Sequence, residues 1–150
     1  MESPRPALAR ILELSYELTS TIALDTLLHR IAAAAQELTQ TESAGILLHD
    51  ETTQELCFVT ATTFADAILN VPVPVDRSIA GACFLAGAPV VVPDVHLDPR
   101  YYPALEELTG VKARSLLAVP MQYQERRIGV LEVENKLDDI PFSADDVAIL

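Results

Sequence analysis

Apolar residues in the first forty positions recur at spacings of three and four, which is typical of amphipathic helices. A narrow row predicts a helix over about residues 6–19 and resembles the seam of a coiled coil. Residues 20–23 interrupt that row, and a broader apolar face then predicts a second helix. The first row is Leu8, Ile11, Ser15, Leu18 and Ile22, and the second is Leu24, Leu27, Leu28, Ile31, Ala35 and Leu38.

Two pairs of apolar runs, each joined by a short polar turn, predict antiparallel hairpins. The first pair is 43–50 and 55–62, and the second is 114–122 and 128–134. Residues 71–76 predict an edge strand because Pro72 and Pro74 cannot donate ladder hydrogen bonds, and 90–92 predict a short strand. The class is therefore α+β, with a central antiparallel sheet of five or six strands. Its expected core residues are Leu47, Phe58, Leu117, Val119, Val130 and Val133.

Capping residues delimit three further helices. Ser78 is the expected N-cap of a helix that runs through residue 85 and ends at Gly87 and Pro89. Residues 104–109 predict one or two helical turns that stop at Gly110. A last helix begins at 142–143, whereas residues 63–70 fit either a loop or a short helix.

Composition narrows the function classes. The 150 residues are 50% hydrophobic, which favours one folded domain, and the net charge of −12 argues against nucleic acid and anionic membrane as partners. Two cysteines suit a reducing compartment. Without a signal peptide or an apolar stretch of membrane-spanning length, we expect a cytoplasmic location and no direct membrane contact.

Motifs for catalysis or metal binding are absent from the sequence. It contains no Gly-rich phosphate loop, no Cys-x-x-Cys, no His-Glu-x-x-His and no Gly-x-Ser-x-Gly. The histidines at 29, 49 and 96 fall on different elements. We therefore expect neither a metal site nor a catalytic centre.

Three segments together resemble the GAF family of sensory domains: 78–100 (SIAGACFLAGAPVVVPDVHLDPR), 114–136 (RSLLAVPMQYQERRIGVLEVENK) and 142–150 (FSADDVAIL). The resemblance implies N- and C-terminal helices on one face of the sheet and a ligand pocket under helices and loops on the other. It also implies a non-catalytic sensor module that regulates an output domain, as in a histidine kinase or a cyclic-dinucleotide enzyme. Residues 1–20 would be a signalling and dimerisation helix, and 21–150 the GAF domain, with its C-terminal helix truncated at 150.

A signature of cyclic-nucleotide-binding GAF domains is matched by Asn135, Lys136, Phe142 and Asp146, but Val147 stands where that signature has Glu. Pairing of Lys136 with Asp146 would pin the last helix to the sheet. Alternatively, Ser143 and Asp146 form a capping box, and both roles are structural. The missing Glu argues against cyclic-nucleotide binding.

The architecture implied by the resemblance places five candidate ligand-binding residues at the pocket: Ser78, Asp94, Tyr101, Arg114 and Ser115. Tyr101 would cover a flat ligand or, alternatively, pack on the sheet. Arg114 would meet an anion or, alternatively, be solvated. No cofactor is assigned, and covalent bilin attachment is not expected because Phe84, not His, follows Cys83.

Two alternatives to a ligand sensor stay open at this point. One is a thiol redox sensor or enzyme that uses Cys83, although Ala80 stands where GAF-fold methionine sulfoxide reductases have a reactive Cys. The other is a ligand-free dimerisation scaffold. As partners we expect the output domain and a second copy, bound through the helix at 6–19 and the C-terminal helix. The alternative is a monomer whose first helix packs on its own sheet.

Overall fold

A six-stranded antiparallel sheet forms the centre of the protein in the computed structural model, which describes residues 5–150 except for the side chains of residues 5, 6, 16, 18, 19 and 21. The strand order is β3-β2-β1-β6-β5-β4. The predicted α+β class and antiparallel sheet are confirmed, and β3, which carries both prolines, lies at one edge. The strands are β1 (Thr41–Asp50), β2 (Glu55–Ala61), β3 (Pro72–Pro74), β4 (Val90–Val92), β5 (Leu116–Tyr123) and β6 (Arg126–Lys136).

The N-terminal helix α1 (Arg5–Thr39) is continuous over 35 residues, so the predicted break at residues 20–23 is wrong. Ser, Thr, Ile and Ala change the apolar pattern there, but none of them removes a backbone donor as proline does, and their helix propensities are adequate. The expected domain boundary at residue 20 falls inside this helix. Residues 1–4 of the expected signalling helix, and the side chain of Leu18, lie outside the described residues.

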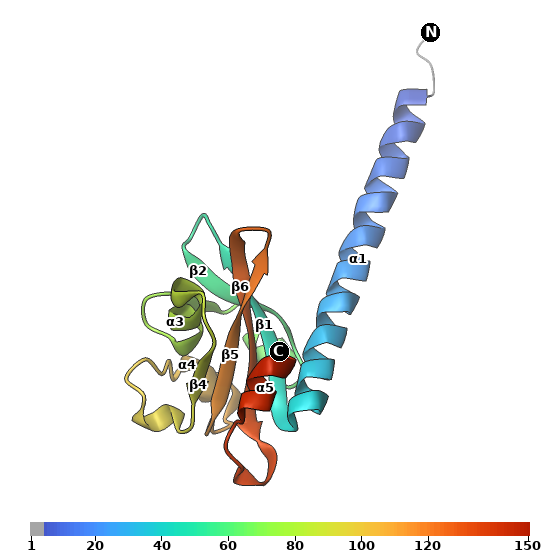
Figure 1. The fold of residues 1–150 in the computed structure, drawn as a ribbon. Coiled ribbons are helices and arrows are strands. Elements are labelled where there is room, and N and C mark those ends of the chain that lie inside the picture. The colour runs from blue at the N-terminus through green and yellow to red at the C-terminus, as the bar shows by residue number, and fades with distance from the viewer. Residues whose placement is uncertain (1–4) are drawn as a thin grey trace.

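One face of the sheet is covered by the C-terminal half of α1 and by α5 (Ala144–Ile149), which lie side by side, while the N-terminal half of α1 projects away from the sheet (Figure 1). From α1, Leu28, Ala32 and Ala35 are buried against this face. The strand residues beneath them are Ile46, Leu117, Val119, Leu131 and Val133. The expected placement of both terminal helices on one face is therefore correct.

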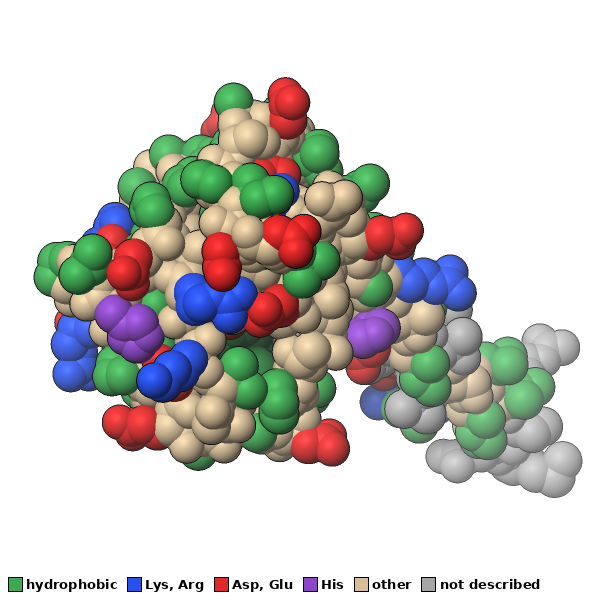
Figure 2. All heavy atoms as spheres, turned by 90° about the horizontal axis from the view of Figure 1, so that it is seen from below, with side chains coloured by type: hydrophobic (Ala, Val, Ile, Leu, Met, Phe, Trp, Pro, Cys, Tyr) green, Lys and Arg blue, Asp and Glu red, His purple; other side chains and the backbone are tan. Residues whose placement is uncertain are grey.

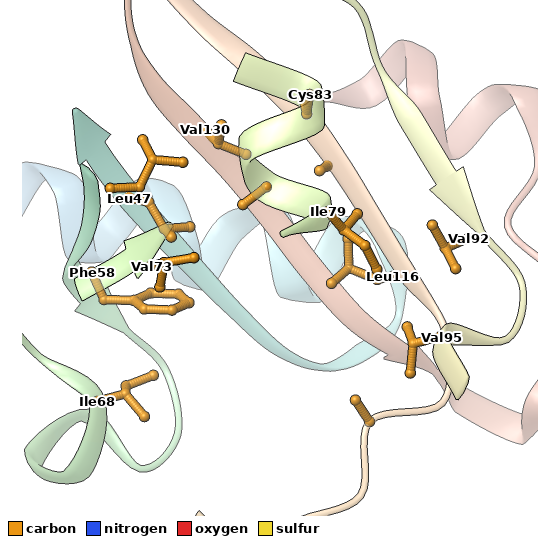
Figure 3. Close-up of a cluster of buried hydrophobic side chains, with 14 of the residues drawn as sticks. Leu47, Phe58, Ile68, Val73, Ile79, Cys83, Val92, Val95, Leu116 and Val130 are labelled. Carbon is orange, nitrogen blue, oxygen red and sulfur yellow. The ribbon is translucent and has the colours of Figure 1, made fainter. Parts of the chain in front are cut away.

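The opposite face carries a second hydrophobic core under α3 (Ile79–Ala86) and the short segments around it (Figure 3). Leu47, Phe58 and Val130 project from the strands toward this side, because alternate residues of a strand point to opposite faces. All six predicted core residues are buried, three on each side. The remaining elements are α2 (Ala65–Ile68), η1 (Val95–Leu97), α4 (Ala104–Thr109) and η2 (Leu137–Asp139).

Local signals in the sequence set the ends of α3 as predicted. The Ser78 side chain accepts a hydrogen bond from the Gly81 N–H, and Gly87 ends the helix in the left-handed conformation. A Cβ at position 81 would lie 2.0 Å from the carbonyl oxygen of Val75. Gly81 therefore allows the chain leaving β3 to pass directly against the helix.

The segment left open at residues 63–70 forms a single helical turn, α2, whose preceding residue Phe64 is in the left-handed conformation. At the C-terminus, Ser143 and Asp146 form the predicted capping box. No helix in the described part of the chain has the length and apolar character needed to span a membrane.

Candidate functional site

A cavity of about 100 Å³ lies between the sheet and the helices α2, α3 and α4, on the face opposite α1. Apolar side chains form most of its wall, including Leu47, Phe58, Ile68, Ile79 and Leu105. The polar lining residues are Ser43, Thr63, Ser78, Tyr101, Tyr102, Glu106, Thr109, Glu132 and Glu134. The cavity thus combines an apolar body with a small polar set, which is the usual character of a small-molecule site.

Two glutamates of β6 face this cavity. Because strand residues alternate in direction, Glu132 and Glu134 point away from α1 while Leu131 and Val133 pack beneath it. On either side of Glu132, the neighbouring strands carry Gly45 and Ala118. These small residues leave the space beside the carboxylate unfilled.

The Gly45 position is needed for this hollow. A Cβ there would lie 2.7 Å from Cε1 of the Phe58 ring, so the ring lies directly over the glycine. Phe58 thereby forms one wall of the cavity beside Glu132.

Both carboxyl groups have pKa values above the ordinary range of glutamate. Burial, and then the charge of Glu134, raise the pKa of Glu132 well above its ordinary value. Burial and the charges of Glu106 and Glu42 raise the pKa of Glu134 to about 7. No described residue donates a hydrogen bond to either carboxylate.

A third carboxylate, Glu106 of α4, lies at the same cavity. It accepts a hydrogen bond from the Tyr101 hydroxyl, and its Oε2 is 3.8 Å from Nε2 of His96. Burial and this hydrogen bond raise the pKa of Tyr101, so the phenol remains a donor. Tyr101 is therefore held at the cavity wall by α4.

The structure brings two of the five predicted ligand-binding residues to the cavity. Ser78 and Tyr101 both line it. The Ser78 hydroxyl already accepts from the Gly81 N–H and donates to the Pro74 carbonyl, 2.5 Å away. Ser78 therefore caps α3, and any ligand contact by Ser78 or Tyr101 stays a prediction.

The other three predicted residues do not line the cavity. Asp94 is exposed and accepts a hydrogen bond from the His96 N–H, which caps η1. Arg114 forms ion pairs with Glu42 and Asp139 on the surface, and Ser115 Oγ accepts from the Lys136 N–H. Because β5 begins only at Leu116, these two residues belong to the segment before the strand rather than to the cavity wall.

The signature residues form a connection between elements. The Lys136 ammonium lies 2.7 and 2.8 Å from the two carboxylate oxygens of Asp146, and 2.7 Å from the Thr39 carbonyl oxygen. Asn135 is buried, and its Oδ1 accepts from the Arg114 and Ser115 N–H groups. The ammonium is 6.0 Å from the Phe142 ring centroid. The predicted pinning of α5 to the sheet is present in the structure.

Glu106, Glu132 and Glu134 were missed from the sequence. A usable signal was present, since Glu132 and Glu134 occupy the same face of the predicted strand as the core residue Val130. Two acids on a core-facing side of a strand indicate a cavity. The acidic residue on α4 offers no comparable signal, because its helix is short and surrounded by loops.

Neither cysteine is placed for thiol chemistry. Cys83 is fully buried, and burial together with the charge of Glu132 raises its pKa to about 12. Cys57 projects toward the α1 face of the sheet, and burial raises its pKa as well. No group of three His, Cys, Asp or Glu side chains within the described residues is arranged to hold a metal ion.

Basic side chains are dispersed on the face that Figure 2 shows. In Figure 2, Lys and Arg side chains on the visible face lie at separate points next to acidic side chains, and no continuous basic patch forms there. Arg114, paired with Glu42 and Asp139, is an example of this arrangement.

Comparison with known proteins identifies similar domains. A family model described as GAF domain matches residues 23–150. The GAF domain of a phosphoenolpyruvate-protein phosphotransferase from Coxiella burnetii has a TM-score of 0.73 at 17% identity, covering 91% of this chain and 83% of that one. A free methionine-R-sulfoxide reductase from Neisseria meningitidis, in complex with its substrate, has a TM-score of 0.67 at 24% identity, covering 99% and 84%. A methyl-accepting chemotaxis protein has a TM-score of 0.71 at 23% identity, covering 90% and 86%.

Proposed function

The chain belongs to the GAF domain family, and we propose that it is a non-catalytic small-molecule sensor that regulates the output of a multidomain signalling protein, such as a histidine kinase or a cyclic-dinucleotide enzyme. The similar domain in a chemotaxis protein supports a role in signalling. The net charge of −12 argues against nucleic acid as partner, and the two cysteines suit the reducing cytoplasm.

The observation that carries the proposal is the cavity with carboxylates that lack partners. A polar group of a largely buried residue normally has a hydrogen-bond partner in the protein or in ordered water, and the oxygens of Glu132 and Glu134 instead open to the cavity. Glu132 is only 5% exposed and faces the cavity. A bound molecule that supplies the missing partner is the explanation we favour over a ligand-free scaffold.

The cysteines argue against the redox alternative. A reactive cysteine is a thiolate near neutral pH and is accessible. Cys83 meets neither condition, since it is buried and its pKa is raised to about 12. Similar solved structures include methionine sulfoxide reductases, but the burial and raised pKa of Cys83 do not support thiol catalysis by this chain.

We also propose that two copies pair through α1, with α5 alongside. Leu8, Ile11 and Ile22 are each more than half exposed on the half of α1 that projects from the sheet. A row of exposed apolar residues at this spacing fits the seam between two helices. Pairing along α1 would place the output domains of two chains next to each other.

A thermal-shift screen of small molecules tests the sensor proposal, because a ligand that binds only the native state raises its melting temperature. A matched pair of variants localises the binding. Thr109→Phe places a ring at the cavity, whereas Thr53→Phe makes the same change in an exposed turn.

Compounds that stabilise the wild type and Thr53→Phe, but not Thr109→Phe, support the proposal. If no compound in a screen of amino acids, nucleotides, amines, acids and aromatic molecules raises the melting temperature, the sensor proposal is wrong. The hypothesis of a ligand-free dimerisation scaffold then replaces it.

A further inference from the structure

All ionisable groups at the cavity are acidic or phenolic. Its charged lining residues are Glu106, Glu132 and Glu134, and no Lys, Arg or His lines it within the part of the chain that the structure describes. A phosphate or carboxylate in this space would meet three carboxyl groups without a neutralising cation. The cavity therefore disfavours anions, cyclic nucleotides included.

Glu132 provides an independent indication of what is bound. Its residue is 5% exposed, its side chain projects into the cavity, and it has no hydrogen bond or ion pair with a described residue. Buried charges in proteins are otherwise paired. The carboxylate oxygens open to the cavity, so their partner is water, a proton or a bound molecule.

The geometry around Glu132 leaves room for such a partner. Gly45 and Ala118 flank it on the adjacent strands, and Glu134 follows two residues later on the same face. The Phe58 ring lies over Gly45, and Tyr101 and Tyr102 line the same cavity. A charged group would thus lie beside two carboxylates while the rest of the molecule contacts aromatic rings.

We propose that the cavity binds a small organic cation, with an ammonium or amidinium group hydrogen-bonded to Glu132 and Glu134 and a flat or apolar body against Phe58 and Tyr101. This assignment rests on the sensor function proposed above and specifies its ligand class. Such groups carry several N–H donors, which match acceptor-only carboxylates. The aromatic wall also favours a cation through its ring faces.

Binding should depend on pH, because the cation requires ionised carboxylates. Glu134 has a pKa of about 7, and the titratable groups that interact with the pair are Glu106 from α4, Tyr101 before α4, Glu42 from β1 and Cys83 from α3. At pH 6 a cationic ligand must displace protons from these carboxyl groups, and at pH 8 it must displace fewer of them. Affinity should therefore rise between these two values.

Three molecules of nearly the same shape test the assignment: benzamidine (cationic), benzamide (neutral) and benzoate (anionic). Their binding is measured by calorimetry at pH 6 and pH 8 on the wild type, Glu132→Gln, Glu134→Gln and Asp94→Asn. Asp94 is an exposed carboxylate that does not line the cavity, so its variant is the matched control. Removal of a buried carboxylate with a raised pKa should not unfold the domain, and the melting temperature of each variant verifies this.

The expected result is binding of benzamidine alone, tighter at pH 8, at least tenfold weaker in each Glu→Gln variant and unchanged in Asp94→Asn. Equal or tighter binding of benzoate or benzamide overturns the cation assignment, as does full affinity in Glu132→Gln. Absence of benzamidine binding to the wild type overturns it too. In each of these cases the sensor proposal stands if the wider thermal-shift screen finds a ligand lost in Thr109→Phe, and it falls separately if that screen finds none.

Discussion

Lys136 joins three elements through one ammonium group. It ends β6, pairs with Asp146 of α5 and donates to the carbonyl of Thr39 in the last turn of α1. The two side chains are only 11% and 6% exposed. Burial acts to raise the pKa of Asp146, but the hydrogen bonds and charge of Lys136, with those of Ser143, hold it below its ordinary value.

Replacing Lys136 with Met should therefore destabilise the fold strongly. The substitution keeps the apolar stem but leaves the Asp146 carboxylate buried without its cation, which costs about 3–5 kcal/mol in comparable pairs. Urea denaturation measures the change. The double variant Lys136→Met with Asp146→Asn should recover part of the loss, and a loss under about 1 kcal/mol for the single variant contradicts this account.

The raised pKa of Glu134 predicts that the stability of the fold decreases as pH rises. Its pKa rises from 4.5 to about 7 on folding, so the folded state retains a proton that the unfolded state has released between these values. Its contribution to stability is present below about pH 4.5 and is lost as pH rises through about 7. At 1.36 kcal/mol per pH unit, the loss is on the order of 3 kcal/mol.

Glu134→Gln should remove most of this loss. We expect the variant to be more stable than the wild type at pH 8 and to differ less from it at pH 5, as measured by denaturation at both values. Glu125→Gln, at an exposed turn, is the control and should match the wild type. An unchanged pH profile in Glu134→Gln would show that this carboxyl is already ionised in the folded protein.

At the residue scale, sequence reasoning succeeded where the spacing itself carries the contact. Lys136, Ser143 and Asp146 are close in sequence, and strand-end and capping rules bring them together. Arg114 and Asp94 were misplaced because their surroundings depend on residues far away, such as Glu42 for Arg114. Glu132 and Glu134 share a strand face with Val130, which indicates a cavity, but no local pattern places Glu106 of the short helix α4 beside them.

At the scale of elements, α1 behaves as two different helical segments. Its C-terminal half buries Leu28, Ala32 and Ala35 on the sheet, whereas Leu8 and Ile11 in the N-terminal half remain 58% and 59% exposed. The described part of the chain therefore leaves Leu8, Ile11 and Ile22 of the N-terminal apolar row largely uncovered. A second copy of the helix is the cover we propose.

Ile11→Glu tests that pairing. A charge in the seam should dissociate the dimer, so light scattering should give the monomer mass for the variant and twice that mass for the wild type. Leu97→Glu is the matched control, because Leu97 is 81% exposed on η1 and lies off the helix. A monomeric wild type, or an Ile11→Glu variant that stays dimeric, excludes this interface.

The β3–α3 connection gives a second prediction at this scale. Gly81→Ala would place a methyl group against the Val75 carbonyl and should cost about 3 kcal/mol through displacement of α3. Gly110→Ala meets no atom within 4 Å and carries only the strain of its positive φ, about 1 kcal/mol. Thermal denaturation of both variants should rank them in this order, and equal losses would show that α3 adapts without strain.

The helices and strands were largely predictable because helix caps, turn residues and the alternation of apolar and polar residues along strands act locally. Ser78, Gly87 and Gly110 mark helix ends in the sequence and in the structure. The exception at residues 20–23 has a physical reason, since a helix continues through a change of its apolar face when no proline or glycine stops it. The single turn α2 was undecided because four residues carry too little periodicity.

At the scale of the whole molecule, the sheet separates the cavity from the terminal helices α1 and α5. Strand β6 contributes side chains to both faces of the sheet. Glu132 and Glu134 point toward the cavity, and Leu131 and Val133 point toward α1 and α5. The same strand continues into Asn135 and Lys136, which hold α5 and the end of α1. A ligand that draws the two glutamates together therefore acts on the strand to which both terminal helices are attached.

The two edges of the sheet have a further consequence for assembly and solubility. β3 contributes only three residues, two of which are prolines without an N–H, and β4 at the other edge is also three residues long. Long regular edges are templates for strand addition by other chains, and proline or brevity suppresses it. The domain is thereby protected from growing into a continuous intermolecular sheet.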